Sequence, residues 1–228
     1  QIINAMARQN RNKGLALNLD WIDSVQMNRS AIERRCSTMT KRRSIKKDWQ
    51  AAWLLKSLSC IDLTTLSSDD TPERVRRLCA KARQPLRPEL VASLGLKGLK
   101  PQVAAVCVYH SFVKTAVKAL QKSEIPVAAV STGFPHGLNP LPRRIEEIMD
   151  SIDDGAKEID IVITRAHVFS KNWQALYDEI SAFREASGTA HLKTILGTGE
   201  LGTFRNVAKA SLVCMMAGAD FIKTSTGK

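Results

Sequence analysis

The sequence predicts an α/β fold with parallel strands, the TIM (β/α)8 barrel, of which about six of eight βα units are present. From residue 60 onward, short β-branched runs alternate with segments of helical apolar spacing. Gly155 and Gly218 each precede a strand, where helix-ending glycines are expected. Polar residues stand at or near the ends of all six strands, which favours a barrel with one central site. An open doubly wound sheet would gather them at one switch point.

The expected elements follow from this alternation. Strands are expected at residues 60–65, 103–109, 126–132, 158–164, 191–198 and 220–224. Helices are expected between them at residues 72–82, 111–121, 142–152, 173–186 and 203–217, and before them at 20–35 and 48–58. Residues 1–18 look loosely ordered. We therefore expect a basic N-terminal helical extension over 1–47 and a partial barrel over 48–228, with strands seven and eight absent.

The two ends of the chain suggest a piece of a longer protein. It begins at Gln1 and stops at Lys228, directly after a strand and without a terminal cap. A six-strand partial barrel leaves sheet edges and apolar faces uncovered. We therefore expect residues 1–228 alone to fold poorly and to be inactive; robust turnover would refute this.

Charge is concentrated near the N-terminus. The net charge is +12, and residues 1–50 hold 11 Lys and Arg against 4 Asp and Glu, with Lys41–Lys47 the densest run. Such a run is typical of a solvated helical face or arm. Nucleic-acid contact is the alternative, but the run lacks interleaved aromatic residues and a recognisable binding module. A basic protein also suits phosphorylated small substrates. No apolar run approaches the ~20 residues of a membrane helix.

The cysteines indicate a reducing compartment. Their number is odd and no CxxC pair occurs, which favours free, mostly buried thiols and a cytoplasmic protein. The five are Cys36, Cys60, Cys79, Cys107 and Cys214. The four histidines show no ligand spacing with them, so no metal site is expected.

Lys223 is the most informative residue. It lies on a short buried strand, where a lysine is costly unless it is paired or neutral. A neutral, desolvated lysine is the standard amine nucleophile toward carbonyl groups. Hydroxyl residues, a glycine and Lys228 follow at once, as suits a site for an anionic substrate.

Asp160 is the second unusual charge. It stands in a β-branched strand, on the same face as Glu158 by period-two alternation. A buried aspartate needs a partner. One interpretation is a structural ion pair with Lys193, which shares its strand face with Ile195; the other is proton transfer beside a nucleophilic amine. A structural pair is the simpler role for Lys193, with a supporting catalytic role as the alternative.

The stretch Gly197–Gly202 matches GxGxxG, follows a strand and precedes a helix. A nucleotide enzyme is therefore a further hypothesis. In a dinucleotide fold, however, the motif follows the first strand and the acid ends the second strand. Here the motif follows about the fifth strand, and Asp220 begins its strand. A tight turn into a helix, with N–H groups able to bind an anion, is preferred.

Six motifs together resemble one known family, deoxyribose-phosphate aldolase. In order and spacing they span residues 48–228, and the longer N-terminal segment resembles the animal branch. The motifs are Ile61–Leu66, Ala105–Tyr109, Gly133–Gly137, Glu158–Val162, Leu192–Leu196 with Thr198–Leu201, and Phe221–Lys228.

The resemblance implies a TIM-barrel class I aldolase, a carbon–carbon lyase that uses neither metal nor cofactor. Such enzymes reversibly cleave 2-deoxy-D-ribose 5-phosphate to acetaldehyde and D-glyceraldehyde 3-phosphate. It implies that Lys223 forms the Schiff base, and that Asp160 relays protons with a water. It also implies that Asp62 and Thr64 help hold the sugar and that Lys228 lies near it.

Two more residues, Thr226 and Cys107, are expected to contact the substrate, although a buried thiol such as Cys107 also packs as a small hydrophobe. The expected partner is a small phosphorylated sugar; neither a membrane nor a nucleic acid is expected, and a homo-oligomer is compatible with the sequence.

The chain also departs from the family pattern. His110 stands where the family's second-strand motif continues with proline. The family's second catalytic lysine, in a Gly-Phe-Lys-Pro-Ala-Gly-Gly context on the seventh strand, has no counterpart, and neither have the phosphate loops of strands seven and eight. An inactive fragment, or a basic RNA-binding protein on an aldolase scaffold, is therefore the alternative reading of function.

Overall fold

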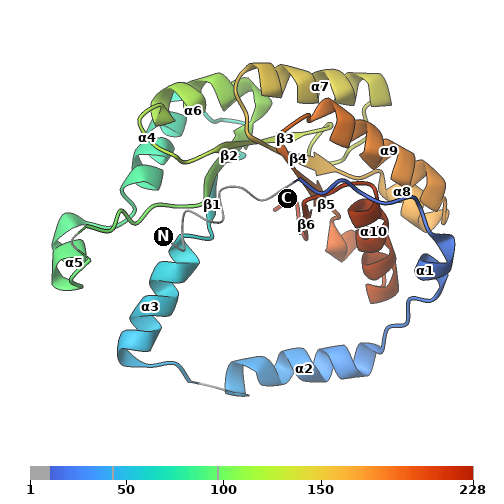
Figure 1. The fold of residues 1–228 in the computed structure, drawn as a ribbon, viewed down its shortest axis with the longest axis horizontal. Coiled ribbons are helices and arrows are strands. Elements are labelled where there is room, and N and C mark those ends of the chain that lie inside the picture. Colours follow the sequence, from blue (N-terminus) through green and yellow to red (C-terminus); the bar gives the residue numbers. More distant parts are fainter. Residues whose placement is uncertain (1–10, 43, 97, 228) are drawn as a thin grey trace. The chain divides into compact units, whose positions relative to one another are not determined.

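The computed structural model describes residues 11–42, 44–96 and 98–227 and has the expected α/β architecture (Figure 1). The strands in these residues are β1 (Asp62–Thr64), β2 (Ala105–Tyr109), β3 (Val127–Ser131), β4 (Glu158–Val162), β5 (His191–Ile195) and β6 (Phe221–Lys223). The pairs β1–β2, β2–β3, β4–β5 and β5–β6 are all parallel. The six predicted strands are confirmed, most of them shorter than expected.

The described residues contain the helices that the apolar spacing predicts between the strands, and two short helices, Pro88–Ser93 and Arg165–Phe169, that it does not predict. They are α1 (Leu19–Asp23), α2 (Arg29–Arg42), α3 (Lys47–Leu58), α4 (Pro72–Arg83), α5 (Pro88–Ser93), α6 (Val113–Leu120), α7 (Leu141–Asp153), α8 (Arg165–Phe169), α9 (Trp173–Ala186) and α10 (Phe204–Met216), with 3-10 turns η2 (His110–Phe112) and η3 (Thr198–Glu200). Thr203 caps α10 by accepting the N–H of Asn206. Gly155 and Gly218 have φ of 100° and 101° after α7 and α10, which confirms them as helix-ending glycines.

The chain forms two compact units. The β4–β6 unit contains the described parts of Gln1–Met27, Ser131–Ile152 and Glu158–Lys228. In it α9 packs on α8 and α10, and α10 packs on β6. The β1–β3 unit contains Asn28–Val130 and Asp153–Lys157, and there α4 packs on α6, β1 and β2. A domain boundary at residue 47 stays a prediction.

The middle strands are buried along their length. Every residue of β3 is buried, and β4 and β5 are buried after their first residue. Such strands read as continuous apolar runs because parallel sheets are covered on both faces. The charged residues Asp160 and Lys193 interrupt these runs with 0% and 7% relative exposure. Because buried charges are costly, two of them at such positions indicate a candidate functional site on these strands.

The region before β1 differs from expectation. The predicted helix over 20–35 is wrong as a single element, because α1 ends at Asp23 and α2 begins at Arg29. The Asn28 side chain accepts the N–H of Ala31 at 2.9 Å and so starts a new helix.

The expectation of loose order over 1–18 is also wrong for Arg11–Leu15, which hydrogen-bond to the β4–β6 unit; residues 1–10 lie outside the described residues. No helix in the described ranges is long and apolar enough to cross a membrane.

Candidate active site

Strand alternation and register bring the charged residues of β4 and β5 to one face. Glu158 pairs with His191 in the β4–β5 register, and Asp160 pairs with Lys193. Successive side chains alternate along each strand, so these four residues share a face. The next strand adds Lys223 at the end of β6, opposite Ile195.

The amines and carboxylates on this face are in contact. The Nζ of Lys223 donates to Oδ2 of Asp160 at 2.5 Å. The Nζ of Lys193 lies 3.4 Å from Oδ1 of Asp160 and 2.5 Å from Oε2 of Glu158. Asp160 therefore stands between two amines, and Lys193 stands between two carboxylates. The sequence prediction that Asp160 pairs with Lys193 is confirmed, and Lys223 is a second partner.

Burial is uneven across this cluster. The side chain of Asp160 has no exposed surface and that of Lys193 is 9% exposed, whereas that of Lys223 is 30% exposed. Breaking a buried ion pair leaves an unpaired charge, which costs several kcal/mol. The inner pair is thus firmly held, while the amine of Lys223 can be reached by a substrate. A carboxylate in contact with an accessible amine can take a proton from the ammonium and return it later.

The loop after β6 is fixed by the loop after β5. The N–H of Leu196 donates to the carbonyl of Lys223 at 2.9 Å, and that of Thr198 donates to Thr224 at 2.8 Å. Thr226 is 8% exposed and thus buried beyond this point. The Lys228 prediction lies outside the described residues.

Three expected substrate contacts belong to the β1–β3 unit. Thr64 ends β1 opposite Cys107 of β2, and its hydroxyl donates to the carbonyl of Asp62 at 2.8 Å. Thr64 is exposed, Asp62 is half-buried and Cys107 has no exposed surface. The burial of Cys107 fits packing as a small hydrophobe; the substrate contacts of all three stay predictions.

The GxGxxG stretch forms the expected tight turn. Gly197 has φ of 65°, the left-handed region that favours glycine, and the chain continues as the 3-10 turn η3 before α10 begins at Phe204. Glu200 in this turn pairs with Arg165 at 2.8 Å. The turn thus ends β5 and returns the chain to α10.

Comparison with known proteins identifies the family of the chain. Residues 56–228 match the model of the DeoC/LacD family aldolases. The chain belongs to this aldolase family. Together with the relatives described next, this match confirms the sequence resemblance to deoxyribose-phosphate aldolase and the α/β fold with part of a TIM barrel.

Individual relatives agree with this assignment. The chain is 56% identical over 218 residues to the deoxyribose-phosphate aldolase of Mus musculus, covering 95% of this chain and 69% of the mouse protein. It is 55% identical over 219 residues to that of Homo sapiens, with the same two coverages. A crystal structure from Coccidioides immitis, provisionally classed as a deoxyribose-phosphate aldolase, superposes with a TM-score of 0.68 at 27% identity, over 93% of this chain and 74% of that one.

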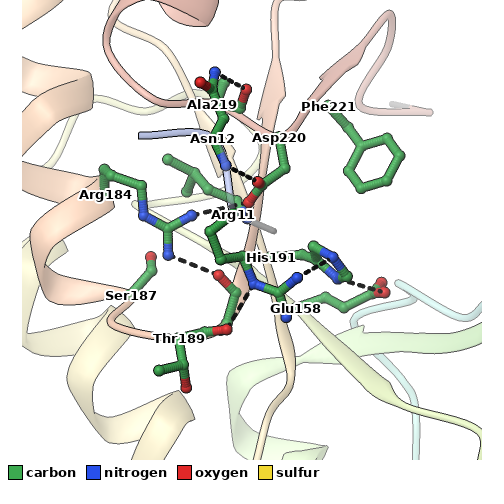
Figure 2. A network of polar contacts seen from close by, with 12 residues as sticks. Arg11, Asn12, Glu158, Arg184, Ser187, Thr189, His191, Ala219, Asp220 and Phe221 are labelled. Carbon is green, nitrogen blue, oxygen red and sulfur yellow. Dashed lines mark hydrogen bonds and ion pairs between the residues drawn. The ribbon is translucent and has the colours of Figure 1, made fainter. Parts of the chain in front are cut away.

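Sequence reasoning placed Glu158 on the face of Asp160 but missed two residues beside these charges, His191 and Arg11. Glu158, His191 and Arg11 form a polar network that Figure 2 shows. His191 stands two positions before Lys193, so alternation could have placed it on the same face. No local signal points to Arg11, which lies 180 residues before His191 in the chain.

The residues that the structure describes offer neither a metal-binding cluster nor a disulfide. Within the described ranges, no group of three or more His, Cys, Asp and Glu residues is placed to hold a metal ion. The five cysteines, all within those ranges, form no disulfide, and Cys79, Cys107 and Cys214 are buried. Burial raises the pKa of the Cys214 thiol to about 12.

Proposed function

We propose that the chain catalyses the reversible cleavage of 2-deoxy-D-ribose 5-phosphate to acetaldehyde and D-glyceraldehyde 3-phosphate, in cytoplasmic deoxyribonucleoside catabolism. The observation that carries the proposal is the contact between the accessible amine of Lys223 and the buried carboxylate of Asp160. The mouse and human relatives are deoxyribose-phosphate aldolases and support the substrate.

Lys223 is the proposed nucleophile. Its neutral amine adds to the C1 aldehyde of the open-chain sugar, and loss of water from the carbinolamine gives an iminium. Asp160 contacts this amine, so it can accept the ammonium proton and supply the proton that carries away the hydroxyl as water. Proximity of this kind replaces an encounter with a solvent acid or base.

The iminium then acts as an electron sink. The C3 hydroxyl loses its proton, the C2–C3 bond breaks, and its electron pair moves into the enamine on Lys223, which releases glyceraldehyde 3-phosphate. Asp160, with a water, protonates the enamine carbon, and hydrolysis of the new iminium releases acetaldehyde and restores the amine. Lys193 supports these steps through its charge, which faces Oδ1 of Asp160 at 3.4 Å.

The remaining proposed site residues would hold the substrate. Asp62 and Thr64 would bind the sugar hydroxyls, and Thr226, Lys228 and Cys107 are proposed to contact the substrate. A phosphorylated sugar suits the net charge of +12, since a basic surface attracts anions.

Reductive trapping tests the proposal. The intact natural protein is incubated with substrate and borohydride, and its peptides are then mapped by mass spectrometry. We expect an irreversible adduct on Lys223, lost in Lys223→Met and kept in Lys118→Met, which removes an exposed lysine. An adduct on another lysine, or none on the wild-type protein, would refute the proposed mechanism.

A further inference from the structure

A short segment near the N-terminus lies against the starts of β5 and β6. In this N-terminal strap, Arg11–Leu15, the backbone N–H of Asn12 donates to Oδ1 of Asp220 at 2.7 Å. The Asn12 amide donates to the carbonyl of Met215 at 2.8 Å. It also donates to the carbonyl of Ala219 at 2.9 Å (Figure 2). These bonds join two segments more than 200 residues apart, so the strap has one defined position on the fold.

The strap lies so close to the end of α10 that position 14 must be a glycine. Gly14 has φ of 72°, and a Cβ at this position would stand 2.6 Å from the carbonyl oxygen of Met216. The N–H of Leu15 donates to that same oxygen at 2.7 Å, and the hydroxyl of Tyr177 donates to the carbonyl of Leu15 at 2.8 Å. Both ends of the strap are thus held against the rest of the β4–β6 unit.

At the start of the strap, Arg11 orients His191. Its Nε donates to the carbonyl of Thr189 at 2.7 Å, and its Nη1 contacts Nε2 of His191. A guanidinium has only donors, so Nε2 must accept and the neutral ring must carry its proton on Nδ1. The second nitrogen, Nδ1, faces Oε1 of Glu158 at 3.6 Å (Figure 2).

Glu158 connects this histidine to the proposed catalytic cluster. Its Oε1 faces His191, and its Oε2 lies 2.5 Å from Nζ of Lys193. Lys193 in turn faces Asp160, the partner of Lys223. A contiguous series of polar contacts therefore runs from the strap to the proposed nucleophile, all within the β4–β6 unit.

The charge state of His191 decides whether the Glu158 carboxylate pairs with Lys193 alone or with both Lys193 and His191. A neutral ring makes a weak contact with the carboxylate, whereas an imidazolium would compete with the Lys193 ammonium for it. Arg11 and Glu158 contact the ring, Asp220 and Lys193 act on it through their charges, and the ring of Phe221 is nearly perpendicular to it at 5.6 Å between centroids. Burial and then Arg11 lower the pKa of His191, against the opposing effects of Glu158 and Asp220.

We propose that Arg11 is a positioning residue, which holds His191 neutral with Nδ1 toward Glu158. The Glu158 carboxylate then keeps its ion pair with the Lys193 ammonium, because no imidazolium competes for it. This role rests on the proposed aldolase function only in its last step, where Lys193 keeps Asp160 in place for proton transfer at Lys223. The strap is thus part of the support of the site, although it lies far from it in the sequence.

Two measurements without substrate test the network in the intact natural protein. NMR titration of the His191 ring should show its pKa rising by about one unit in Arg11→Gln, and returning toward the wild-type value in Arg11→Lys. Trace acetic anhydride labelling should show Lys193 reacting about tenfold faster in Arg11→Gln below that raised pKa, as expected for a one-unit fall in the lysine pKa.

The controls separate the network from simple undocking of the strap. Lys13→Gln removes an exposed positive charge from the same strap and should leave both profiles unchanged. In a His191→Asn background, Arg11→Gln should no longer change Lys193 labelling, because the competing imidazolium is gone. Unchanged His191 titration, or unchanged Lys193 labelling, in Arg11→Gln would overturn the inference.

A third measurement connects the network to turnover. In Arg11→Gln the acidic limb of the kcat profile should move up by about one pH unit with little change in KM, and this shift should vanish in the His191→Asn background. Absence of the shift overturns the last step. If the wild-type protein forms no trapped adduct at all, the proposed function fails, while the titration and labelling still decide the network.

Discussion

The Nζ of Lys223 lies 2.5 Å from Oδ2 of Asp160, a carboxylate with no exposed surface. The other oxygen of Asp160 faces Lys193 at 3.4 Å. One buried carboxylate therefore serves two amines, of which only Lys223 is substantially accessible. That asymmetry supports the different roles proposed for the two lysines, since a nucleophile must be reached by its substrate whereas a supporting charge need not be.

Removing the charge of Asp160 tests its proposed proton transfer. In Asp160→Asn, which keeps the side chain's shape, we expect kcat to fall about 10²- to 10⁴-fold, the usual contribution of a positioned acid or base. Steady-state kinetics on the intact natural protein would measure it. Asp178→Asn, an exposed change on α9, serves as the control. An unchanged kcat in Asp160→Asn would contradict the assignment.

Replacing Lys193 tests the buried pairs. Lys193→Met leaves Glu158 and Asp160 without this partner, and loss of one partner of a buried pair costs about 3–5 kcal/mol. Urea unfolding should show this loss in the free energy of unfolding. Lys114→Met removes a lysine that is 83% exposed and pairs with Asp154 at 3.3 Å, and should cost about 1 kcal/mol or less. Equal costs for the two variants would argue against a firmly held inner pair.

Adding one Cβ atom at Gly14 tests how closely the strap packs against the carbonyl of Met216. Gly14→Ala places a Cβ 2.6 Å from a carbonyl oxygen at a positive φ, and we expect it to destabilise the protein by about 1–3 kcal/mol. Gly199→Ala is the matched control, because its Cβ would have no neighbour within 4 Å and its φ is not positive. Thermal unfolding of both variants measures the difference, and the same Tm for both would mean that the strap does not dock.

Thiol reactivity should divide the five cysteines by burial. Iodoacetamide at pH 8 should modify the exposed Cys36 and Cys60 and leave Cys214 intact, because a pKa of about 12 leaves almost no thiolate there. Peptide mass spectrometry before and after denaturation reads out each site. Rapid modification of Cys214 in the folded protein would show that the α10 packing opens readily.

His191 should make the fold sensitive to acid. Its pKa is lowered by burial and by Arg11, so below about pH 6.5 the unfolded chain binds a proton that the folded chain resists. Stability contributed by the neutral ring is therefore lost as the pH falls below that value. His191→Asn should show a smaller loss of unfolding free energy between pH 7 and 5, and His136→Asn controls for removal of an exposed histidine. An identical slope in wild type and His191→Asn would contradict the prediction.

Local patterns were sufficient for much of the fold. Alternation over residues 158–164 correctly puts Glu158 and Asp160 on one face, and register with β5 brings Lys193 opposite Asp160. Helical spacing correctly predicts α4, α6, α7, α9 and α10, which follow β1 to β5, but it misses the short helices α5 and α8. It fails over 20–35, where apolar periodicity continues but the Asn28 side chain competes for a backbone N–H and divides the segment.

By itself, the sequence determined the βα succession, the aldolase family and the unusual lysine on the last described strand, because periodicity and motifs are local properties of the chain. Only the tertiary structure decided that Asp160 contacts Lys223 as well as Lys193, and that Arg11 reaches His191. These contacts join residues up to 180 positions apart. Burial explains these pairings, because a buried charge without a partner would cost free energy.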